Sequence, residues 1–193
     1  LTAAQATGKT IAGDGSAIIT DASPTTQYDF SNINMGTGVA TLKTSGSGTL
    51  LDTAATQSFQ ADSAVNGTDE TITISGHGFT NGQRIQYNKN GGTDINNLTS
   101  GNTYYVLSAT TNTFKVAATS GGSAINITAG GAETHQFRLL GTDLTGIEAI
   151  TTSGTDTLTL TATQAGAKTL TTSGSSDSMV INVATGNDLS GAG

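Results

Sequence analysis

Apolar and polar residues alternate along much of the chain, a pattern typical of strands with one buried face. Threonine and leucine alternate through residues 157–161, and threonine and isoleucine through 71–74. Threonine is β-branched, so it loses rotamer freedom in a helix and fits the pleated surface of a strand. Only residues 162–167 favour a single helical turn. The pattern predicts a chain built mainly of short strands.

Glycine-rich breaks separate the strand-like segments, for example at residues 13–15, 45–48, 91–92 and 130–131. Glycine, serine and aspartate are typical of tight turns. We therefore expect brief strands joined by short turns throughout.

The two ends of the chain resemble each other. Residues 1–6 (LTAAQA) match 160–165 (LTATQA), and both are followed at the same spacing by lysine, threonine and an aliphatic residue. Residues 29–34 likewise match 143–148, with aspartate at the first position and isoleucine at the fifth. Self-similarity of this kind indicates a repeat architecture.

A third match pairs residues 44–50 with 152–158, through Thr-Ser-Gly followed by Thr-Leu. The Thr-Ser-Gly of 152–154 recurs at 172–174, after 20 residues. That period is typical of one coil of a solenoid, in which each repeat contacts its neighbours.

The middle of the chain differs from both ends. It holds three of the four tyrosines, both histidines and Asn-Gly turns at residues 81–82 and 90–91. Its alternating segments predict the strands of a small antiparallel sandwich or barrel. These strands are expected at residues 70–75, 84–87, 103–107, 113–117, 124–127 and 134–138.

The predicted fold class is therefore all-β: β-solenoid-like repeat coils with an inserted small antiparallel β-sandwich or barrel. The first repeat segment is expected at residues 1–61, the inserted module at 62–137, and the second repeat segment at 138–193.

Composition excludes several classes of function. The 193 residues include 14 acidic and 7 basic ones, for a net charge of -7, and the basic residues are scattered singly. Nucleic-acid binding needs clustered lysine and arginine, so we expect no such partner. The absence of cysteine excludes thiolate nucleophiles and cysteine-based zinc sites and is consistent with secretion. No apolar run reaches the roughly 18 residues of a membrane span.

The sequence contains little evidence of a catalytic site. The two imidazoles, His77 and His135, lie in no catalytic-triad or zinc-ligand pattern. We interpret His77 as a turn histidine whose ring bonds a backbone carbonyl, and His135 as an ordinary strand residue. Gly8-Lys9-Thr10 lacks the upstream glycine and following helix of a phosphate-binding loop. The chain is therefore not expected to be an enzyme.

Aspartates in turns are the better candidates for ligands, because calcium prefers several carboxylate and carbonyl oxygens. Asp188 lies in the glycine-rich end of the chain, where residues 186–193 resemble the opening of a calcium-binding RTX nonapeptide. Asp156 and Asp177 each follow a Ser-Gly turn and precede a strand. All three are candidate calcium ligands, and solvated turn carboxylates are the alternative interpretation of Asp156 and Asp177.

Two family resemblances follow from these motifs. Residues 144–150 and 156–162 resemble the β-solenoid repeats of RTX-type bacterial surface-layer proteins and giant adhesins. Residues 77–82, 104–106 and 114–117 are similar to a small β module found in giant adhesins and phage tail-fibre proteins. The resemblance implies a secreted, repetitive scaffold, often calcium-stabilised. The lack of an initiator methionine and of a signal peptide leads us to expect a piece of a longer polypeptide.

The leading hypothesis is a non-enzymatic structural segment of a secreted bacterial cell-surface protein, either surface-layer lattice or adhesin stalk. It would be extracellular, self-associating or packed on neighbouring repeats, with a cell-surface glycan or receptor as a further candidate partner. One alternative is a phage virion structural protein, as tail fibre or capsid decoration. A more remote one is a polysaccharide-active β-helix enzyme, which would need clustered acidic residues and aromatic platforms.

Overall fold

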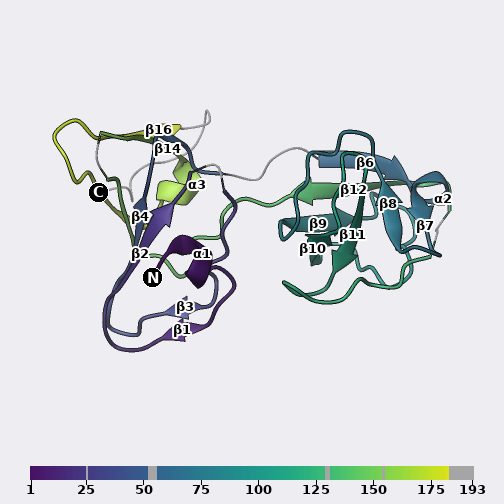
Figure 1. The fold of residues 1–193 in the computed structure, drawn as a ribbon, viewed down its shortest axis with the longest axis horizontal. Helices are drawn as coiled ribbons and strands as arrows, with labels where there is room; N and C mark the ends of the chain where they lie inside the picture. The colour runs from purple at the N-terminus through teal and green to yellow at the C-terminus, as the bar shows by residue number, and fades with distance from the viewer. Residues whose placement is uncertain (25, 52–55, 129–130, 154, 183–193) are drawn as a thin grey trace. The chain divides into compact units, whose positions relative to one another are not determined.

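The computed structural model divides the chain into two compact units (Figure 1). Unit 1 combines Leu1–Asp52 with Gly141–Gly193, and unit 2 is Thr53–Leu140. The structure describes residues 1–24, 26–51, 56–128, 131–153 and 155–182.

Unit 1 is a β-solenoid, in which strands from successive coils stack in parallel. The longest of its sheets has the order β15-β13-β4-β2, a second has the order β16-β14-β5, and β1 pairs with β3. All these pairs are parallel. The strands are β1 (Ile11–Ala12), β2 (Ala17–Ala22), β3 (Ile33–Asn34), β4 (Ala40–Thr44), β5 (Gly48–Thr49), β13 (Ala149–Thr151), β14 (Thr157–Thr161), β15 (Thr169–Thr171) and β16 (Ser178–Asn182).

These strands define four coils in the described part of unit 1. The first coil carries β1 and β2, the second β3 to β5, the third β13 and β14, and the fourth β15 and β16. Between the second and third coils the chain passes through unit 2. The third coil nevertheless stacks directly on the second, because β13 pairs with β4 and β14 with β5.

A column of aliphatic side chains runs through the coils. Ile19 pairs with Leu42, Leu42 with Ile150, and Ile150 with Leu170. Ile19, Leu42 and Ile150 are fully buried. Burial of a large aliphatic side chain contributes about 1.5–3 kcal/mol, so this in-register column stabilises each coil on the next.

Residues 1–6 and 160–165, which match in sequence, also share their local structure. Each segment forms a one-turn helix, α1 (Ala3–Ala6) and α3 (Ala162–Ala165). Each helix begins with a capping box. The threonine side chain accepts from the backbone N–H of the glutamine three residues later, and the glutamine side-chain oxygen accepts from the backbone N–H of the threonine. The pairs are Thr2 with Gln5 and Thr161 with Gln164. The predicted helical turn at 162–167 therefore exists.

The third sequence match holds at the turn but not at the following strand. Thr151 pairs with Lys43, which aligns Thr152 with Thr44 as expected. The next strand pairs Leu158 with Gly48, not with Leu50. The third coil has two more residues in this turn than the second, so that Leu160 rather than Leu158 lies level with Leu50.

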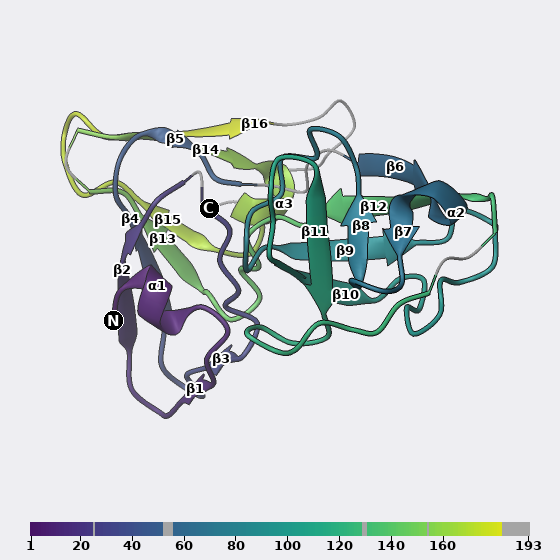
Figure 2. The same ribbon diagram turned by 45° about the vertical axis from the view of Figure 1, so that its right-hand side comes forward.

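Unit 2 is an antiparallel sheet with strand order β6-β12-β9-β10-β11-β8-β7 (Figure 2). Phe114 of β11 and Phe137 of β12 have ring centroids 5.6 Å apart, although two strands separate β11 from β12. The sheet therefore curls around an aromatic core. Its elements are β6 (Thr56–Gln60), α2 (Ala61–Ala64), β7 (Val65–Asn66), β8 (Thr71–Thr73), β9 (Arg84–Asn88), β10 (Thr103–Leu107), β11 (Thr113–Ala117) and β12 (Thr134–Leu139).

The boundaries of the inserted module need correction. The sequence placed them at 62 and 137, whereas unit 2 runs from Thr53 to Leu140. The reason is β6, which the sequence assigned to the repeat segment but which pairs with β12 along its whole length. The strand expected at 124–127 is also absent; that segment is irregular, although the Ile125 amide donates to the Val116 carbonyl.

Candidate functional site

Asp177, one of the three candidate calcium ligands, lies in the turn between β15 and β16. Its Oδ2 accepts from Thr152 Oγ1 at 2.9 Å, from the Gly174 amide at 2.9 Å and from the amide and hydroxyl of Ser173, both at 3.1 Å. Its Oδ1 accepts from the Asp156 amide at 3.1 Å. Desolvation favours a raised pKa, but these hydrogen bonds outweigh it and hold the pKa of Asp177 below its ordinary value.

Asp156 repeats this arrangement one coil earlier. Its Oδ2 accepts from the Gly46 amide at 2.8 Å, and its own amide donates to Asp177. Each of the two carboxylates thus accepts a backbone N–H from the preceding coil. We call Gly46, Asp156 and Asp177 the carboxylate ladder. Its role in the described structure is to bind one coil to the next.

Hydroxyl side chains lie beside the carboxylate ladder. Ser47 Oγ accepts from the Thr157 amide at 2.9 Å, and Ser178 Oγ donates to Thr157 Oγ1 at 2.9 Å. Serine and threonine therefore join the same three coils at this corner. The turns of the solenoid are held by side chains as well as by sheet hydrogen bonds.

A second corner explains the match between residues 29–34 and 143–148. Asp29 and Asp143 form a parallel bridge. Asp29 Oδ1 accepts from the amide and hydroxyl of Ser31, and Asp143 Oδ1 accepts from those of Thr145. The shared Asp-x-Ser/Thr pattern is therefore the signature of a turn that the chain uses twice.

Gly146 and Lys168 show how closely the coils stack at this second corner. A Cβ on Gly146 would lie 2.5 Å from the Phe30 carbonyl oxygen, so only glycine fits there. Lys168 Nζ donates to the carbonyl oxygens of Leu144 at 2.9 Å and Ile147 at 2.7 Å. Burial lowers the pKa of Lys168, against the opposing effect of Glu148 and Asp143.

Two of the three candidate calcium ligands, Asp156 and Asp177, lie together at one corner of the solenoid. Both carboxylates accept hydrogen bonds there. Asp188 lies outside the described residues. Within the described part of the chain, no group of three or more His, Cys, Asp or Glu side chains could hold a metal ion. Calcium binding therefore stays a prediction.

Both histidines lie in the core of unit 2. His77 is 3% exposed, and its Nδ1 accepts from the Phe79 amide at 2.9 Å. The ring thus bonds a backbone N–H rather than the carbonyl that we expected, and it packs against Phe79 and Phe114.

His135 is fully buried next to Tyr87. The Tyr87 hydroxyl accepts from the Ile95 amide at 3.0 Å and lies 2.8 Å from His135 Nδ1. The two groups share one hydrogen bond, and its direction depends on which ring nitrogen of His135 carries the proton. Burial lowers the pKa of His135, against the opposing effect of Glu133 and Asp94. The Nε2 of His135 is also buried and has no hydrogen-bond partner among the described residues.

The two ends of the solenoid differ. At the first coil, the Thr20 amide donates to the Leu1 carbonyl at 2.8 Å, and Thr2 bridges to Thr20, so residues 1–2 cover part of β2. At the fourth coil, β16 pairs with β14 alone among the described strands. Val180 on this strand is 44% exposed. Among the described residues, one side of β16 therefore has no strand beside it, and we call this side the open edge.

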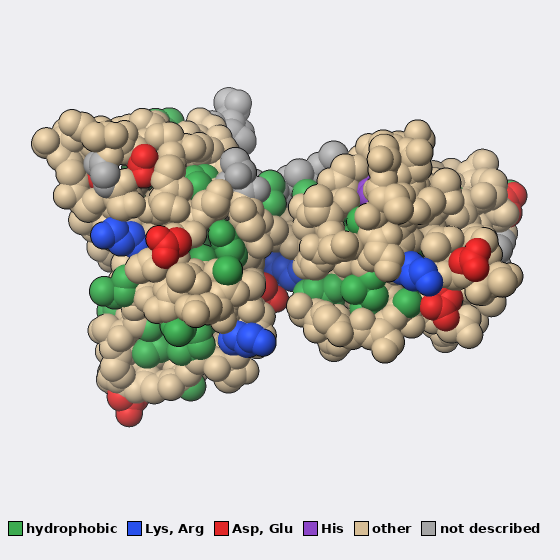
Figure 3. Space-filling view, in the orientation of Figure 1, with side chains coloured by type: hydrophobic (Ala, Val, Ile, Leu, Met, Phe, Trp, Pro, Cys, Tyr) green, Lys and Arg blue, Asp and Glu red, His purple; other side chains and the backbone are tan. Residues whose placement is uncertain are grey.

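The surface is polar but carries few charges. On the faces visible in Figure 3, acidic and basic side chains are few, and uncharged side chains and backbone cover most of each unit. Only 11% of all residues are charged. Such a surface favours packing against similar surfaces over long-range attraction of charged partners.

Comparison with known proteins identifies no relative. No protein-family model matches the chain, and no curated protein and no solved structure matches it. In the described part of the chain, no helix has both the length and the apolar character needed to cross a membrane. Function must therefore be argued from the solenoid, its corners and the sheet of unit 2.

Proposed function

We propose that the chain is a non-enzymatic structural segment of a secreted bacterial cell-surface protein, a surface-layer lattice or an adhesin stalk. The observation that carries the proposal is the solenoid of unit 1, in which each coil presents the next with matching hydrogen-bond partners. The carboxylate ladder, the aliphatic column and the parallel strands all repeat along one direction. An element of this kind extends by stacking further coils.

The open edge at β16 provides the surface for that extension. The neighbour on this edge would be another coil of the same polypeptide or a second copy of the chain. Either would pair with the backbone of β16 and cover Val180. A virion fibre would use the same edge in the same way, so the phage alternative differs in location and not in mechanism.

Unit 2 fits the role of a spacer or ligand-binding unit carried by the scaffold. Its chain leaves the solenoid after Leu51 and returns at Thr142, whose amide donates to the Leu51 carbonyl at 2.8 Å. Insertions at such corners are tolerated because they leave the stacked strands unbroken. The scaffold role and the ligand-binding role are therefore separable.

The proposal is tested by imaging the purified protein with negative-stain electron microscopy at increasing concentration. Val180→Lys places a charge on the open edge, which opposes strand addition. The matched control is Val39→Lys, because Val39 is similarly exposed, at 42% against 44%, but does not lie on β16.

We expect fibres or sheets for the parent protein and for Val39→Lys, and isolated molecules for Val180→Lys. Assembly that persists in Val180→Lys would show that β16 is not the assembling edge. Isolated molecules in all samples at every concentration would contradict self-assembly.

A further inference from the structure

A polar hollow lies on the outer face of the unit 2 sheet. Its volume is about 270 Å³, and its walls come from β6, β9 and β12, which are neighbours in the sheet. The lining side chains are Thr56, Gln86, Asn88, Gln136 and Arg138.

Strand register explains why these residues meet. Arg138 pairs with both Thr56 and Gln86, while Gln136 pairs with Asn88. The alternate residues of β12, His135 and Phe137, are fully buried in the core. The lining therefore occupies the outward positions of three adjacent strands.

Hydrogen bonds hold the lining side chains in place. Arg138 Nη2 donates to Gln86 Oε1 at 2.8 Å, and Gln86 Nε2 donates to the Gly101 carbonyl at 2.9 Å. Gln136 Nε2 donates to Ser58 Oγ at 3.4 Å. The guanidinium is thus positioned by a chain of contacts and retains donors for a ligand, which reduces the entropy lost on binding.

The chemistry of the lining selects a polyhydroxylated ligand with a negative charge. Amide and hydroxyl groups donate to and accept from sugar hydroxyls, and the planar guanidinium binds a carboxylate through two parallel hydrogen bonds. No carboxylate is among the described residues that line it, so Arg138 makes this part of the hollow positive on a chain of net charge -7. None of these described lining residues is aromatic either, so charge would replace the ring stacking that commonly binds neutral sugars.

We propose that this hollow binds an acidic carbohydrate, such as one uronic acid residue of a polysaccharide chain. Its volume is just below that of the smallest typical small-molecule pockets, roughly 300 Å³. The hollow is also open to solvent, so it can hold one sugar residue while the rest of the polysaccharide chain extends outside it. The proposal deepens the ligand-binding role suggested above for unit 2 and rests on that part of the proposed function.

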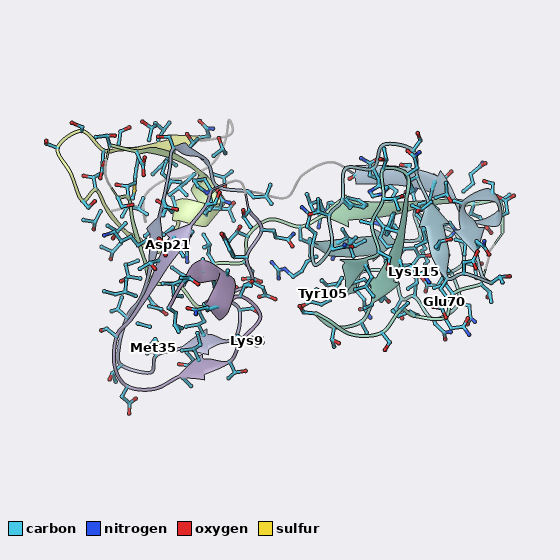
Figure 4. All side chains as sticks on the ribbon, viewed as in Figure 1. Lys9, Asp21, Met35, Glu70, Tyr105 and Lys115 are labelled. Carbon is cyan, nitrogen blue, oxygen red and sulfur yellow. The ribbon has the colours of Figure 1, made fainter. Side chains whose placement is uncertain are left out.

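The test titrates the whole 193-residue protein with oligogalacturonate and, separately, with maltohexaose as a neutral oligosaccharide, using isothermal titration calorimetry. Arg138→Gln removes the charge, and Gln86→Glu supplies a carboxylate that occupies the guanidinium. Lys115→Gln is the matched control, because it removes one positive charge from β11, outside the hollow (Figure 4). Unfolding curves of each variant establish that it is folded.

We expect oligogalacturonate to bind the parent protein and Lys115→Gln alike, and to bind Arg138→Gln and Gln86→Glu about tenfold or more weakly. Binding of maltohexaose with equal affinity, or an unchanged affinity in Arg138→Gln, would overturn the proposal. So would the absence of binding by the parent protein at millimolar ligand, or full displacement by inorganic phosphate at constant ionic strength. Electron micrographs of the same samples report separately on the scaffold function.

Discussion

Replacement of Tyr87 by phenylalanine tests the buried polar network of unit 2. The tyrosine hydroxyl accepts from the Ile95 amide at 3.0 Å and is hydrogen-bonded to His135 Nδ1 at 2.8 Å. Phenylalanine keeps the ring, so its packing near Phe137 is retained, but it leaves both polar groups without this partner.

The expected loss follows from counting the orphaned groups. Each buried polar group left without a partner costs about 1–3 kcal/mol. Two such groups give about 2–6 kcal/mol, and relaxation or entry of a water molecule lowers the expected loss to about 2–4 kcal/mol.

Tyr104→Phe provides a graded comparison in the same core. The Tyr104 side chain is also buried, and among the described residues its hydroxyl accepts from one group, the Thr99 amide, at 2.7 Å. One orphaned group predicts a loss of about 1–3 kcal/mol, roughly half of that for Tyr87→Phe.

Urea unfolding followed by near-ultraviolet circular dichroism measures both losses, because the tyrosines of unit 2 dominate that signal in a chain without tryptophan. The urea dependence of the free energy is expected to be unchanged. A loss for Tyr87→Phe no larger than that for Tyr104→Phe would refute the assignment of a doubly bonded hydroxyl.

Three further predictions concern pH, packing and metal. Burial lowers the pKa of His135 below 6.5, so as the pH falls the unfolded form binds a proton before the folded form does. The contribution of His135 to the stability of unit 2 should therefore be complete above about pH 6.5 and decrease as the pH falls below it. Thermal melts between about pH 7.5 and 5 would measure this decrease, and a melting temperature that does not change with pH would contradict it. Ile150→Ala should cost unit 1 about 2–5 kcal/mol in calorimetry, against about 0.5 kcal/mol or less for exposed Val180→Ala, and equal losses would reject the aliphatic column. If Asp188 and the turn carboxylates hold calcium, excess chelator lowers the melting temperature of the parent protein and not that of Asp188→Asn; an unchanged parent melt rejects structural calcium.

The solenoid was predictable because its local motifs recur. The Thr-x-x-Gln capping box and the Asp-x-Ser/Thr turn each place a side chain on the backbone two or three residues away, so the same letters produce the same geometry. Such contacts need no knowledge of distant parts of the chain. Matching short segments was therefore sufficient to find the repeats at both ends.

Long-range pairing was not predictable in this way. The strand β6 (TQSFQ) has a single apolar residue, so its pattern does not assign it to either unit, and only its pairing with β12, far along the chain, places it in unit 2. Similarly, the polar hollow joins outward positions of strands that are distant in sequence, so Gln86 and Arg138 show no shared motif. The hydrogen-bonding roles of Asp156 and Asp177 were also hidden, because their donors lie in neighbouring coils.

The hydrogen bond between the Thr142 amide and the Leu51 carbonyl implies that unit 2 can be replaced by another domain. Because the two ends of the insertion meet within one hydrogen bond, the host solenoid places almost no demand on the length or fold of what lies between them. A short glycine-containing linker in place of residues 53–140 should close the corner, and another domain with adjacent ends could be grafted there. One scaffold could in this way display different binding modules without any change to its stacked coils.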